Sequence, residues 1–405
     1  MLVASPRTAR LVLVTPEGSL LGSLPPIPVR TPYWQDILPV VEAARAHFGV
    51  DLIVLRLLET EILGSRGGEV TYLAEAPPWF DSSAQPVSPW HGVLAAHALR
   101  LPYAKPGGPT ADLQWAEAIL QRHGLARVGK PEQMRTWNLS SIWRIPLAGR
   151  NAWLKVVPPF FAHEGALIER LSGQSVPRLI GHDGCRILLD EVPGEDLYVA
   201  DLATHLAMVE LLVEIQGAWM NRAEELSAIG LRDYTGNLPR EFEQLLELRA
   251  DELLPTDKAV LENFVRQLPA RLRKIEECGL GNTLVHGDFH PGNLRSDGTT
   301  LTLIDWGDSG IGNPMLDQSA FIERVSERDI PEVRQHWANR WRQTIAGCDP
   351  ERAAELIRPI ASAHRAVQYQ MFLDNIEPSE RVYHCSDPAD WLHQTAMDYE
   401  ACTTR

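Results

Sequence analysis

The sequence predicts an α+β protein of more than one domain, and three observations lead to this fold class. The chain has 405 residues, enough for roughly two to three domains. Strand and helix patterns alternate over residues 1–105, and a second group of strand patterns follows at 134–157. The rest of the chain is predicted to be mostly helical. We therefore expect an N-terminal α+β domain over 1–105, a strand-rich region over 110–193 and a helical region over 194–405.

The N-terminal domain is predicted from hydrophobic spacing and from turn residues. Apolar side chains recur at helical spacing over residues 32–48, and Gly49 ends this helix. Short β-rich runs, bounded by glycine and proline, predict strands on both sides of it. These runs cover residues 11–14, 52–58 and 70–74.

The order of helix, glycine and strand in this domain faintly resembles the Nudix hydrolase arrangement. The helix of that family needs a cluster of glutamates to bind metal, whereas residues 32–48 offer only Asp36 and Glu42. The sequence therefore predicts an accessory domain of unknown role, without the acidic metal cluster.

Charge and hydropathy limit the classes of partner. The formal net charge is −15, which argues against nucleic acid or an anionic membrane as a partner. It suits a cationic small molecule, although a merely solvated acidic surface would give the same net charge. No uninterrupted apolar run in the sequence reaches the length of a bilayer span.

The five cysteines are scattered, odd in number and without C-x-x-C spacing. This usage predicts a reducing cytoplasm and argues against a structural metal site. Nothing in the sequence predicts an oligomeric state.

Two carboxylates and one carboxamide are expected on neighbouring loops. Positions 291 and 292 are Pro and Gly, which break regular structure, so Asp288 and Asn293 are expected on a loop. The β-rich run at 300–304 then carries Asp305 to a strand end. Phosphoryl transfer from a nucleotide needs such a set, in which one carboxylate orients the acceptor hydroxyl or takes its proton. The Asn and the second Asp hold Mg²⁺ against the phosphates.

The same stretch resembles a known family. His-Gly-Asp at 286–288, Asn293 five positions after Asp288, and Asp-Trp-Gly at 305–307 are similar to the catalytic and metal loops of aminoglycoside phosphotransferases and choline-kinase-like enzymes. The resemblance implies a bilobal protein-kinase-like fold, with a small β-rich lobe before a large helical lobe. Glycine follows the histidine, as in the small-molecule kinases, where protein kinases usually have arginine.

The resemblance also implies roles in nucleotide binding for the strand-rich region. Lys155 lies centrally in an apolar strand, where an ammonium group is costly unless it is paired. By resemblance it contacts the α- and β-phosphates of ATP. Its partner would come from the next helix, 162–171, where Glu164 matches the family pattern better than Glu169 does.

Two further segments are implied to contact the nucleotide. Residues 138–141 lie between two predicted strands, where a kinase-like fold closes a loop over the phosphates. Backbone N–H groups there, and the hydroxyls of Ser140 and Ser141, would contact phosphate oxygens, although a plain hairpin turn is an equal alternative for either serine alone. After the strand that ends near Asp190, the backbone of Glu191 and Val192 would form the hinge that contacts adenine.

In the catalytic region the resemblance implies that Asp288 orients or deprotonates the acceptor hydroxyl. It implies that Asn293 and Asp305 bind Mg²⁺. His286 would be structural, and Asp317 would hydrogen-bond the active-site loops.

Helices are predicted at 202–220, 240–254 and 258–278, and the tail from 331 onward is helical too. By resemblance the C-terminal helices line the acceptor pocket, and the aromatic and acidic side chains of the tail are a candidate for it. Ordinary core aromatics and a solvated acidic face would explain each of them singly. The candidates are Tyr369, Phe372, Asp374, Glu377, Tyr383, Asp387, Asp390 and Trp391.

The expected reaction is transfer of the γ-phosphoryl group of ATP to a hydroxyl of a small molecule, such as an aminoglycoside, an amino sugar or choline. A non-catalytic nucleotide-binding or scaffold module is the competing class, against which the presence of Lys155, Asp288, Asn293 and Asp305 counts. A protein kinase is the second alternative. The missing G-x-G-x-x-G and A-P-E segments argue against it.

Overall fold

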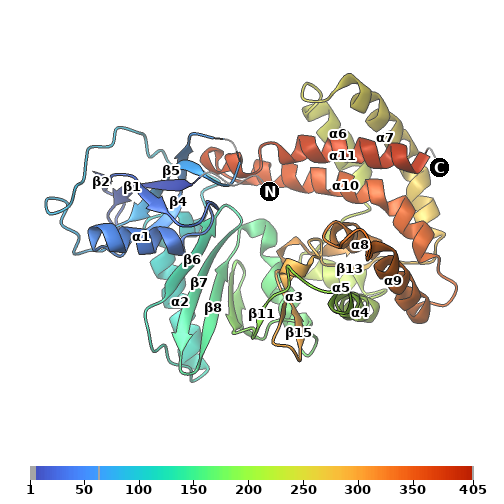
Figure 1. The fold of residues 1–405 in the computed structure, drawn as a ribbon, viewed down its shortest axis with the longest axis horizontal. Helices are drawn as coiled ribbons and strands as arrows, with labels where there is room; N and C mark the ends of the chain where they lie inside the picture. Colours follow the sequence, from blue (N-terminus) through green and yellow to red (C-terminus); the bar gives the residue numbers. More distant parts are fainter. Residues whose placement is uncertain (1–5, 63, 404–405) are drawn as a thin grey trace. The chain divides into compact units, whose positions relative to one another are not determined.

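The computed structural model describes residues 6–62 and 64–403 (Figure 1). The chain divides into two compact units. The first comprises Met1–Gly165, Leu179–Glu191 and Phe372–Cys385, and the second comprises Ala166–Arg178, Val192–Met371 and Ser386–Arg405. Residues 372–385, which the sequence assigned to the helical lobe, therefore pack within the first unit.

The N-terminal part of the first unit is a five-stranded sheet with one α-helix. The strand order is β2-β1-β5-β4, with β3 paired to β1; β1 and β5 run parallel and the other pairs are antiparallel. Buried aliphatic side chains of the strands and of α1 form its core. The strands are β1 (Arg7–Val14), β2 (Leu20–Ser23), β3 (Ile27–Val29), β4 (Ile53–Thr60) and β5 (Gly68–Glu75), and the helix is α1 (Leu38–Phe48).

Helix α1 ends at Gly49, as predicted, because this glycine adopts the left-handed conformation (φ 69°) in which its N–H bonds Arg45. The helix begins at Leu38 rather than at residue 32. The preceding residues form a turn at Trp34 and Gln35. They hydrogen-bond the next sheet through the N–H of Ile37 and the carbonyl oxygen of Gln35. A helix over these residues would lose both bonds.

The second sheet of this unit is antiparallel, in the order β6-β7-β8-β10-β9. Helix α2 packs Ala116, Ile119 and Leu120 into the same core as Trp143 and Leu154 of the sheet. The strands are β6 (Glu132–Trp137), β7 (Ser140–Leu147), β8 (Arg150–Val156), β9 (Leu179–Asp183) and β10 (Arg186–Asp190); the helices are η1 (Pro102–Ala104), α2 (Gly108–Arg122), η2 (Pro159–Phe161) and α3 (His163–Arg170).

One buried glutamine links the two sheets. The pairing of β4 with β5 shifts register between Val54 and Arg56. The side chain of Gln133 in β6 accepts from Val54 N at 2.9 Å and donates to Val54 O at 2.6 Å. Because both polar groups of Val54 are satisfied in this way, β4 and β6 lie together without a continuous ladder.

The helix η5 (Pro378–Tyr383) joins the N-terminal sheet from far along the chain. The buried carboxylate of Glu380 accepts from Leu57 N in β4 at 2.8 Å. Glu377 accepts three hydrogen bonds from Arg100, at 3.2, 3.0 and 2.7 Å. Tyr383 lies in the hydrophobic core of the N-terminal sheet. These contacts join residues that are up to 323 positions apart.

The Glu380 carboxyl makes stability depend on pH. Burial raises its pKa to about 8, and the nearby Glu377 acts in the same direction. Since the folded pKa lies above the unfolded one, the folded state keeps a proton that the unfolded state has lost. Stability is therefore full below about pH 4.5 and falls as pH rises to about 8, by at most about 1.4 kcal/mol per pH unit. Denaturant unfolding of Glu380→Gln should lack this slope; equal slopes in variant and wild type would contradict the assignment.

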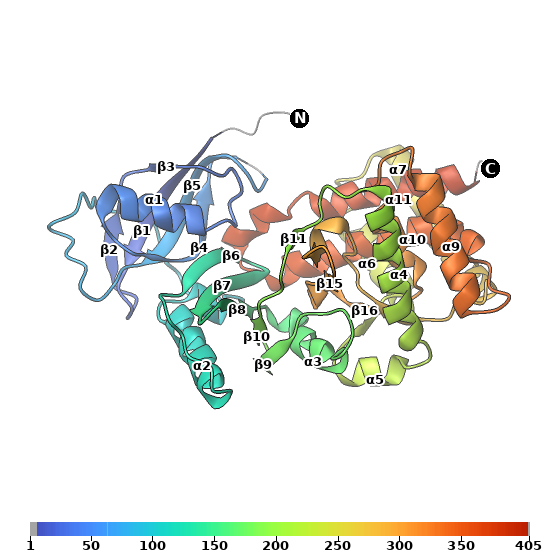
Figure 2. The same cartoon turned by 60° about the horizontal axis from the view of Figure 1, so that its bottom comes forward.

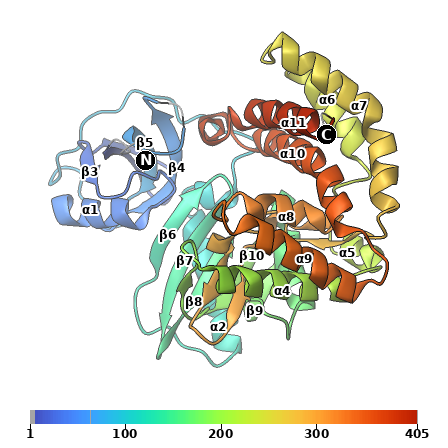
Figure 3. The same cartoon turned by 45° about the vertical axis from the view of Figure 1, so that its right-hand side comes forward.

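The second unit is mainly helical. Helix α4 packs along α9 (Figure 2), and α7 packs on both α6 and α11 (Figure 3). Its helices are α4 (Leu202–Ala218), α5 (Ala223–Ala228), α6 (Leu238–Leu248), α7 (Pro255–Glu276), α8 (Met315–Ile322), α9 (Ile330–Thr344), α10 (Pro350–Asn375, which continues into the first unit) and α11 (Asp387–Thr403). The three helices predicted before the catalytic loop are α4, α6 and α7.

Short strands of the second unit form two three-stranded sheets, β11-β14-β15 and β12-β16-β13. They carry the predicted catalytic and metal loops. Their bounds are β11 (Glu195–Asp196), β12 (Arg232–Asp233), β13 (Thr283–Val285), β14 (Leu294–Ser296), β15 (Leu301–Leu303) and β16 (Gly310–Gly312), with the 3₁₀ helices η3 (Pro291–Asn293) and η4 (Trp306–Asp308). Within residues 6–62 and 64–403, no helix is long and apolar enough to cross a membrane.

Candidate active site

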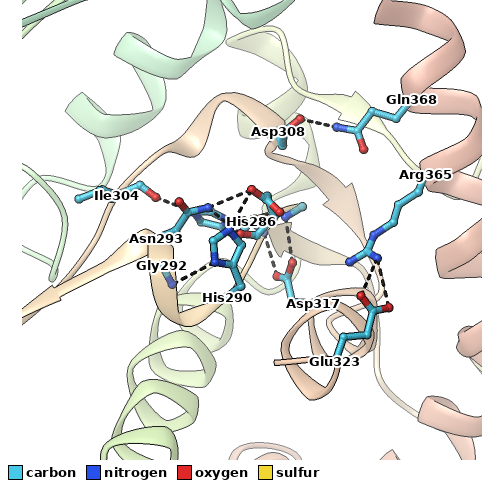
Figure 4. Close-up of polar contacts among 12 residues, drawn as sticks. His286, His290, Gly292, Asn293, Ile304, Asp308, Asp317, Glu323, Arg365 and Gln368 are labelled. Atoms are coloured by element: carbon cyan, nitrogen blue, oxygen red, sulfur yellow. Dashed lines mark hydrogen bonds and ion pairs between the residues drawn. The ribbon is translucent and has the colours of Figure 1, made fainter. Parts of the chain in front are cut away.

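The catalytic loop runs from the end of β13 to η3. Strand β13 is fully buried, whereas 47% of the Asp288 side chain is exposed. Asn293, at the end of η3, donates from Nδ2 to the backbone oxygen of Asp288 at 2.9 Å and to Asp288 Oδ2 at 3.0 Å (Figure 4). The loop predicted from Pro291 and Gly292 is present, and it brings Asp288 and Asn293 into direct contact.

His290 supports the same carboxylate. Its Nε2 lies 3.4 Å from Asp288 Oδ2, and its Nδ1 accepts from Gly292 N at 3.0 Å. The backbone donor requires Nδ1 to be the acceptor, so Nε2 carries the proton that faces Asp288. Asp288 Oδ2 thus accepts from Asn293 and lies near His290, while Oδ1 has no hydrogen-bond partner among the residues that the structure describes.

The second carboxylate, Asp305, is brought beside Asn293 by strand pairing. Leu294 pairs with Leu303, and Ile304 N donates to the Asn293 carbonyl at 2.9 Å. Asp305 itself adopts a left-handed backbone conformation (φ 65°, ψ 63°). That conformation is uncommon for a residue with a side chain and is characteristic of strained functional positions.

His286 lies behind these loops and is completely buried. Its Nε2 bonds the carbonyl oxygen of Ile304 at 3.0 Å, and its Nδ1 accepts from Asp288 N at 3.3 Å. Burial lowers the pKa of His286, although Asp288 acts to raise it. The neutral ring therefore donates to the metal loop and accepts from the catalytic loop, which is the structural role that was predicted.

Asp317, near the start of α8, anchors the catalytic loop from the other side. Its carboxylate accepts from His286 N and Gly287 N, each at 2.9 Å, and from Gln216 Nε2 at 2.8 Å. Burial raises its pKa to about 7, although the two backbone bonds act to lower it. The prediction that Asp317 hydrogen-bonds the active-site loops is confirmed.

Gly287 is required by a close backbone approach. It has φ 84°, and a Cβ atom added to it would lie 1.9 Å from the carbonyl oxygen of Asp308. Both the conformation and the space exclude any side chain. The glycine between His286 and Asp288 is therefore what allows the catalytic and metal loops to touch.

Asp308 is a residue that sequence reasoning missed. Its Oδ1 accepts from Gln368 Nε2 of α10 at 2.5 Å (Figure 4). Its carbonyl oxygen accepts from Tyr234 OH at 2.5 Å. It thereby connects the metal loop to two distant segments. Its place directly after Asp-Trp-Gly was the only signal in the sequence, while Gln368 and Tyr234 gave none.

Lys155 and Glu164 form the predicted ion pair within the first unit. Lys155 Nζ lies 2.7 Å from Glu164 Oε1, and Glu164 is only 1% exposed. Lys155 is in β8 and Glu164 is in the first turn of α3. The pairing is confirmed, and the contact of Lys155 with phosphates stays a prediction.

Replacing Lys155 by Met should weaken nucleotide binding and also destabilise the fold. The variant removes the cation that is predicted to contact phosphate, so we expect the Kd for Mg-ATP to rise by about tenfold or more. It also leaves Glu164 buried without this cation, so the melting temperature should fall. Adding Glu164→Gln should restore the melting temperature but not the affinity. Recovery of both by the double variant would show that Lys155 is only structural.

The predicted phosphate loop at 138–141 is wrong in its bounds. The turn comprises only Asn138 and Leu139, and Ser140 and Ser141 are buried residues of β7. Ser140 Oγ accepts from Trp137 Nε1 at 3.1 Å, and Ser141 Oγ accepts from Trp143 Nε1 at 3.2 Å. Both hydroxyls are thus used inside the sheet, and we no longer assign them to phosphate binding.

The predicted hinge coincides with the boundary between the two units, because the first includes Glu191 and the second resumes at Val192. Strand β10 ends just before it. The Glu191 carboxylate accepts from Asn151 N at 3.0 Å, which ties the hinge to β8. The contact of this backbone with adenine stays a prediction.

The candidate acceptor cluster of the tail is wrong for two of its members. Glu377 is buried against Arg100 and Arg56, and Tyr383 is buried between the rings of Trp34 and Trp137. Trp391 instead stacks with the guanidinium group of Arg365, 4.4 Å from the ring centre.

The donor set of the second unit fits a hard divalent cation. Asn293 uses its Nδ2 for Asp288, so its side-chain oxygen is the atom left for a metal. That oxygen and the Asp305 carboxylate are ligands of the type that Mg²⁺ prefers. A site with one or two protein oxygens is usual where phosphates supply the others.

The fold and these loops define a phosphotransferase of the protein-kinase-like class. Residues 141–356, more than half of the chain, match the model of the phosphotransferase enzyme family APH. The chain belongs to this family. Residues 1–140 lie outside the match. No curated protein matches the sequence.

Solved structures of low sequence identity share the fold. A choline kinase from Streptococcus pneumoniae is 13% identical with a TM-score of 0.52, covering 72% of this chain and 99% of its own. A putative aminoglycoside phosphotransferase from Ralstonia eutropha is 17% identical with a TM-score of 0.51, covering 73% and 98%. A choline kinase from Cryptosporidium parvum is 11% identical with a TM-score of 0.51, covering 72% and 95%. The α+β, protein-kinase-like fold predicted from the sequence is confirmed.

Proposed function

We propose that the protein transfers the γ-phosphoryl group of ATP to a hydroxyl group of a small molecule in a Mg²⁺-dependent reaction. The observation that carries the proposal is the contact of the two loops that bear Asp288, Asn293 and Asp305. Strand pairing and Gly287 bring these loops together, and His286 hydrogen-bonds both.

Asp288 is suited to orient an acceptor hydroxyl. Its Oδ2 accepts a hydrogen bond from Asn293, and His290 lies 3.4 Å from the same oxygen, so the carboxylate is fixed in direction. Its Oδ1 has no partner within the described part of the chain and can accept the hydroxyl proton. Most of the rate enhancement would come from positioning and from charge neutralisation, so no covalent nucleophile is required.

The other assigned residues bind the nucleotide. Asn293 and Asp305 offer oxygen ligands to the metal, and Lys155, oriented by Glu164, offers a cation to the phosphates. The backbone of Glu191 and Val192 would bind adenine. When bound, Mg²⁺ neutralises charge on the phosphates.

The acceptor is best sought among small alcohols, including cationic ones. The relatives with the same fold are named as an aminoglycoside phosphotransferase, a macrolide phosphotransferase and choline kinases. The net charge of −15 suits a cationic acceptor.

The test is ADP release from Mg-ATP against a panel of aminoglycosides, macrolides, amino sugars, choline and neutral sugars, with Asp288→Asn as the matched control. One acceptor should stimulate release from the wild type and not from the variant. A wild type that binds no nucleotide would refute the proposal.

A further inference from the structure

The turn between β6 and β7 lies at the same end of the sheet as Lys155. Ile142 pairs with Lys155, and Ser141 pairs with Val156, the last residue of β8. The turn at Asn138 and Leu139 follows within a few residues, about 10 Å beyond Lys155 along the strand direction. Lys155 and this turn therefore share one end of the sheet.

The turn is anchored by the side chain of Asn138, which is buried, whereas side chains in hairpin turns are usually exposed. Asn138 is only 3% exposed. Its Nδ2 donates to the carbonyl oxygen of Glu380 at 3.1 Å, and its Oδ1 lies 3.3 Å from His384 Nε2. Both of its polar groups are thus used by residues more than 240 positions away.

The residue before the turn is held by the same segment. The ring of Trp137 contacts Tyr383 and His384, each with centroids 5.6 Å apart. Its carbonyl oxygen accepts from Tyr103 OH at 2.8 Å. Residues 137 and 138 are therefore fixed from both sides.

Residues 377–384, which anchor the β6–β7 turn, are themselves bound to the N-terminal sheet. Glu380 accepts from Leu57 N, and Tyr383 belongs to the core that Trp34 and Tyr72 also fill. Glu377 lies 3.7 Å from Arg56 and 2.7 Å from Arg100. The contacts run from the β4 strand through η5 to the turn.

We infer that the N-terminal domain, acting through residues 377–384, positions the β6–β7 turn for nucleotide binding, and that Asn138 is the positioning residue. This inference rests on the proposed function and gives residues 1–105 a role in it. A turn that is already held in place loses less conformational entropy when phosphates bind, so part of the nucleotide affinity would derive from a domain outside the family match.

The test compares Asn138→Ala with Glu380→Gln in the full-length protein. Asn138→Ala removes both bonds of the turn. Glu380→Gln keeps a side-chain oxygen that can accept from Leu57 N, and it does not change the backbone carbonyl oxygen to which Asn138 donates. We expect Asn138→Ala to raise the Kd of Mg-ATP, and the KM for it, about five- to tenfold with kcat nearly unchanged. Glu380→Gln should keep the wild-type Kd.

His384→Ala provides a second route to the same contact. This variant should also raise the Kd of Mg-ATP. In the double variant with Asn138→Ala, the fold-increase in Kd should be smaller than the product of the two single fold-increases, because both substitutions break the same contact. Purely structural damage would lower the melting temperature and the active fraction and leave Kd and KM unchanged, and that result would overturn the inference. If the wild type bound no nucleotide at all, the proposed function would fail first. If it bound normally and Asn138→Ala bound equally well, only the inference would fail.

Discussion

Replacing Asp288 by Asn is expected to lower kcat by about a thousandfold while the Kd of Mg-ATP stays within about twofold of wild type. In the proposed reaction the carboxylate orients the acceptor hydroxyl and takes its proton, and an amide of the same shape cannot take the proton. Nucleotide binding is assigned to other side chains, so it should be spared. Steady-state ADP release, together with equilibrium nucleotide titration, measures the two effects separately.

The matched control is Asp297→Asn, in the tight turn between β14 and β15. Among the residues that the structure describes, Asp297 hydrogen-bonds only Thr299 and Thr300 of its own turn, and its amide variant keeps an acceptor there. Its kcat should match wild type. If Asp288→Asn kept near-normal turnover, Asp288 would not be the residue that activates the hydroxyl.

Replacing Asp305 by Asn should abolish the response of nucleotide binding to Mg²⁺ and reduce kcat/KM by more than about a thousandfold. The substitution suits the backbone, because asparagine tolerates the left-handed conformation that residue 305 adopts. The fold should therefore persist, and the loss can be assigned to the charge of the metal ligand.

The measurement is nucleotide titration with Mg²⁺ and with a chelator. Wild type should bind more tightly in the presence of Mg²⁺, whereas Asp305→Asn should give similar Kd values in both conditions. The two variants thus carry opposite signatures: Asp288→Asn keeps metal-dependent binding and loses turnover, while Asp305→Asn loses both. A variant at 305 that kept the full Mg²⁺ response would remove this residue from the metal site.

The features predicted correctly from the sequence are those set by nearby residues. Asp288 and Asn293 are joined by a loop that Pro291 and Gly292 determine, and Lys155 and Glu164 are nine positions apart. In each case the local elements alone bring the side chains together. The fold class followed because the catalytic and metal loops have a characteristic spacing.

The errors have two physical origins. Ser140 and Ser141 were placed in a loop because a kinase-like fold closes a loop over the phosphates between these two strands. Their positions continue the alternation of β7, in which Trp143, Ile145 and Leu147 are buried on the face that Ser141 shares, so the alternation itself indicated a strand.

Glu377 and Tyr383 were misplaced for another reason. Their partners Arg100 and Trp34 lie hundreds of positions earlier in the chain. Neither hydrophobic period nor turn chemistry encodes which distant segments will pack together.

The close approach at Gly287 has a consequence for how this chain can drift over evolutionary time. At many loop positions a mutation can exchange the residue without moving the backbone. At position 287, by contrast, any side chain would displace the carbonyl group of Asp308. Asp308 lies only three positions after Asp305, so the displacement would reach the proposed metal ligand. We therefore expect a homologue that lacks this glycine to be inactive, even if it keeps every ionisable residue of the site.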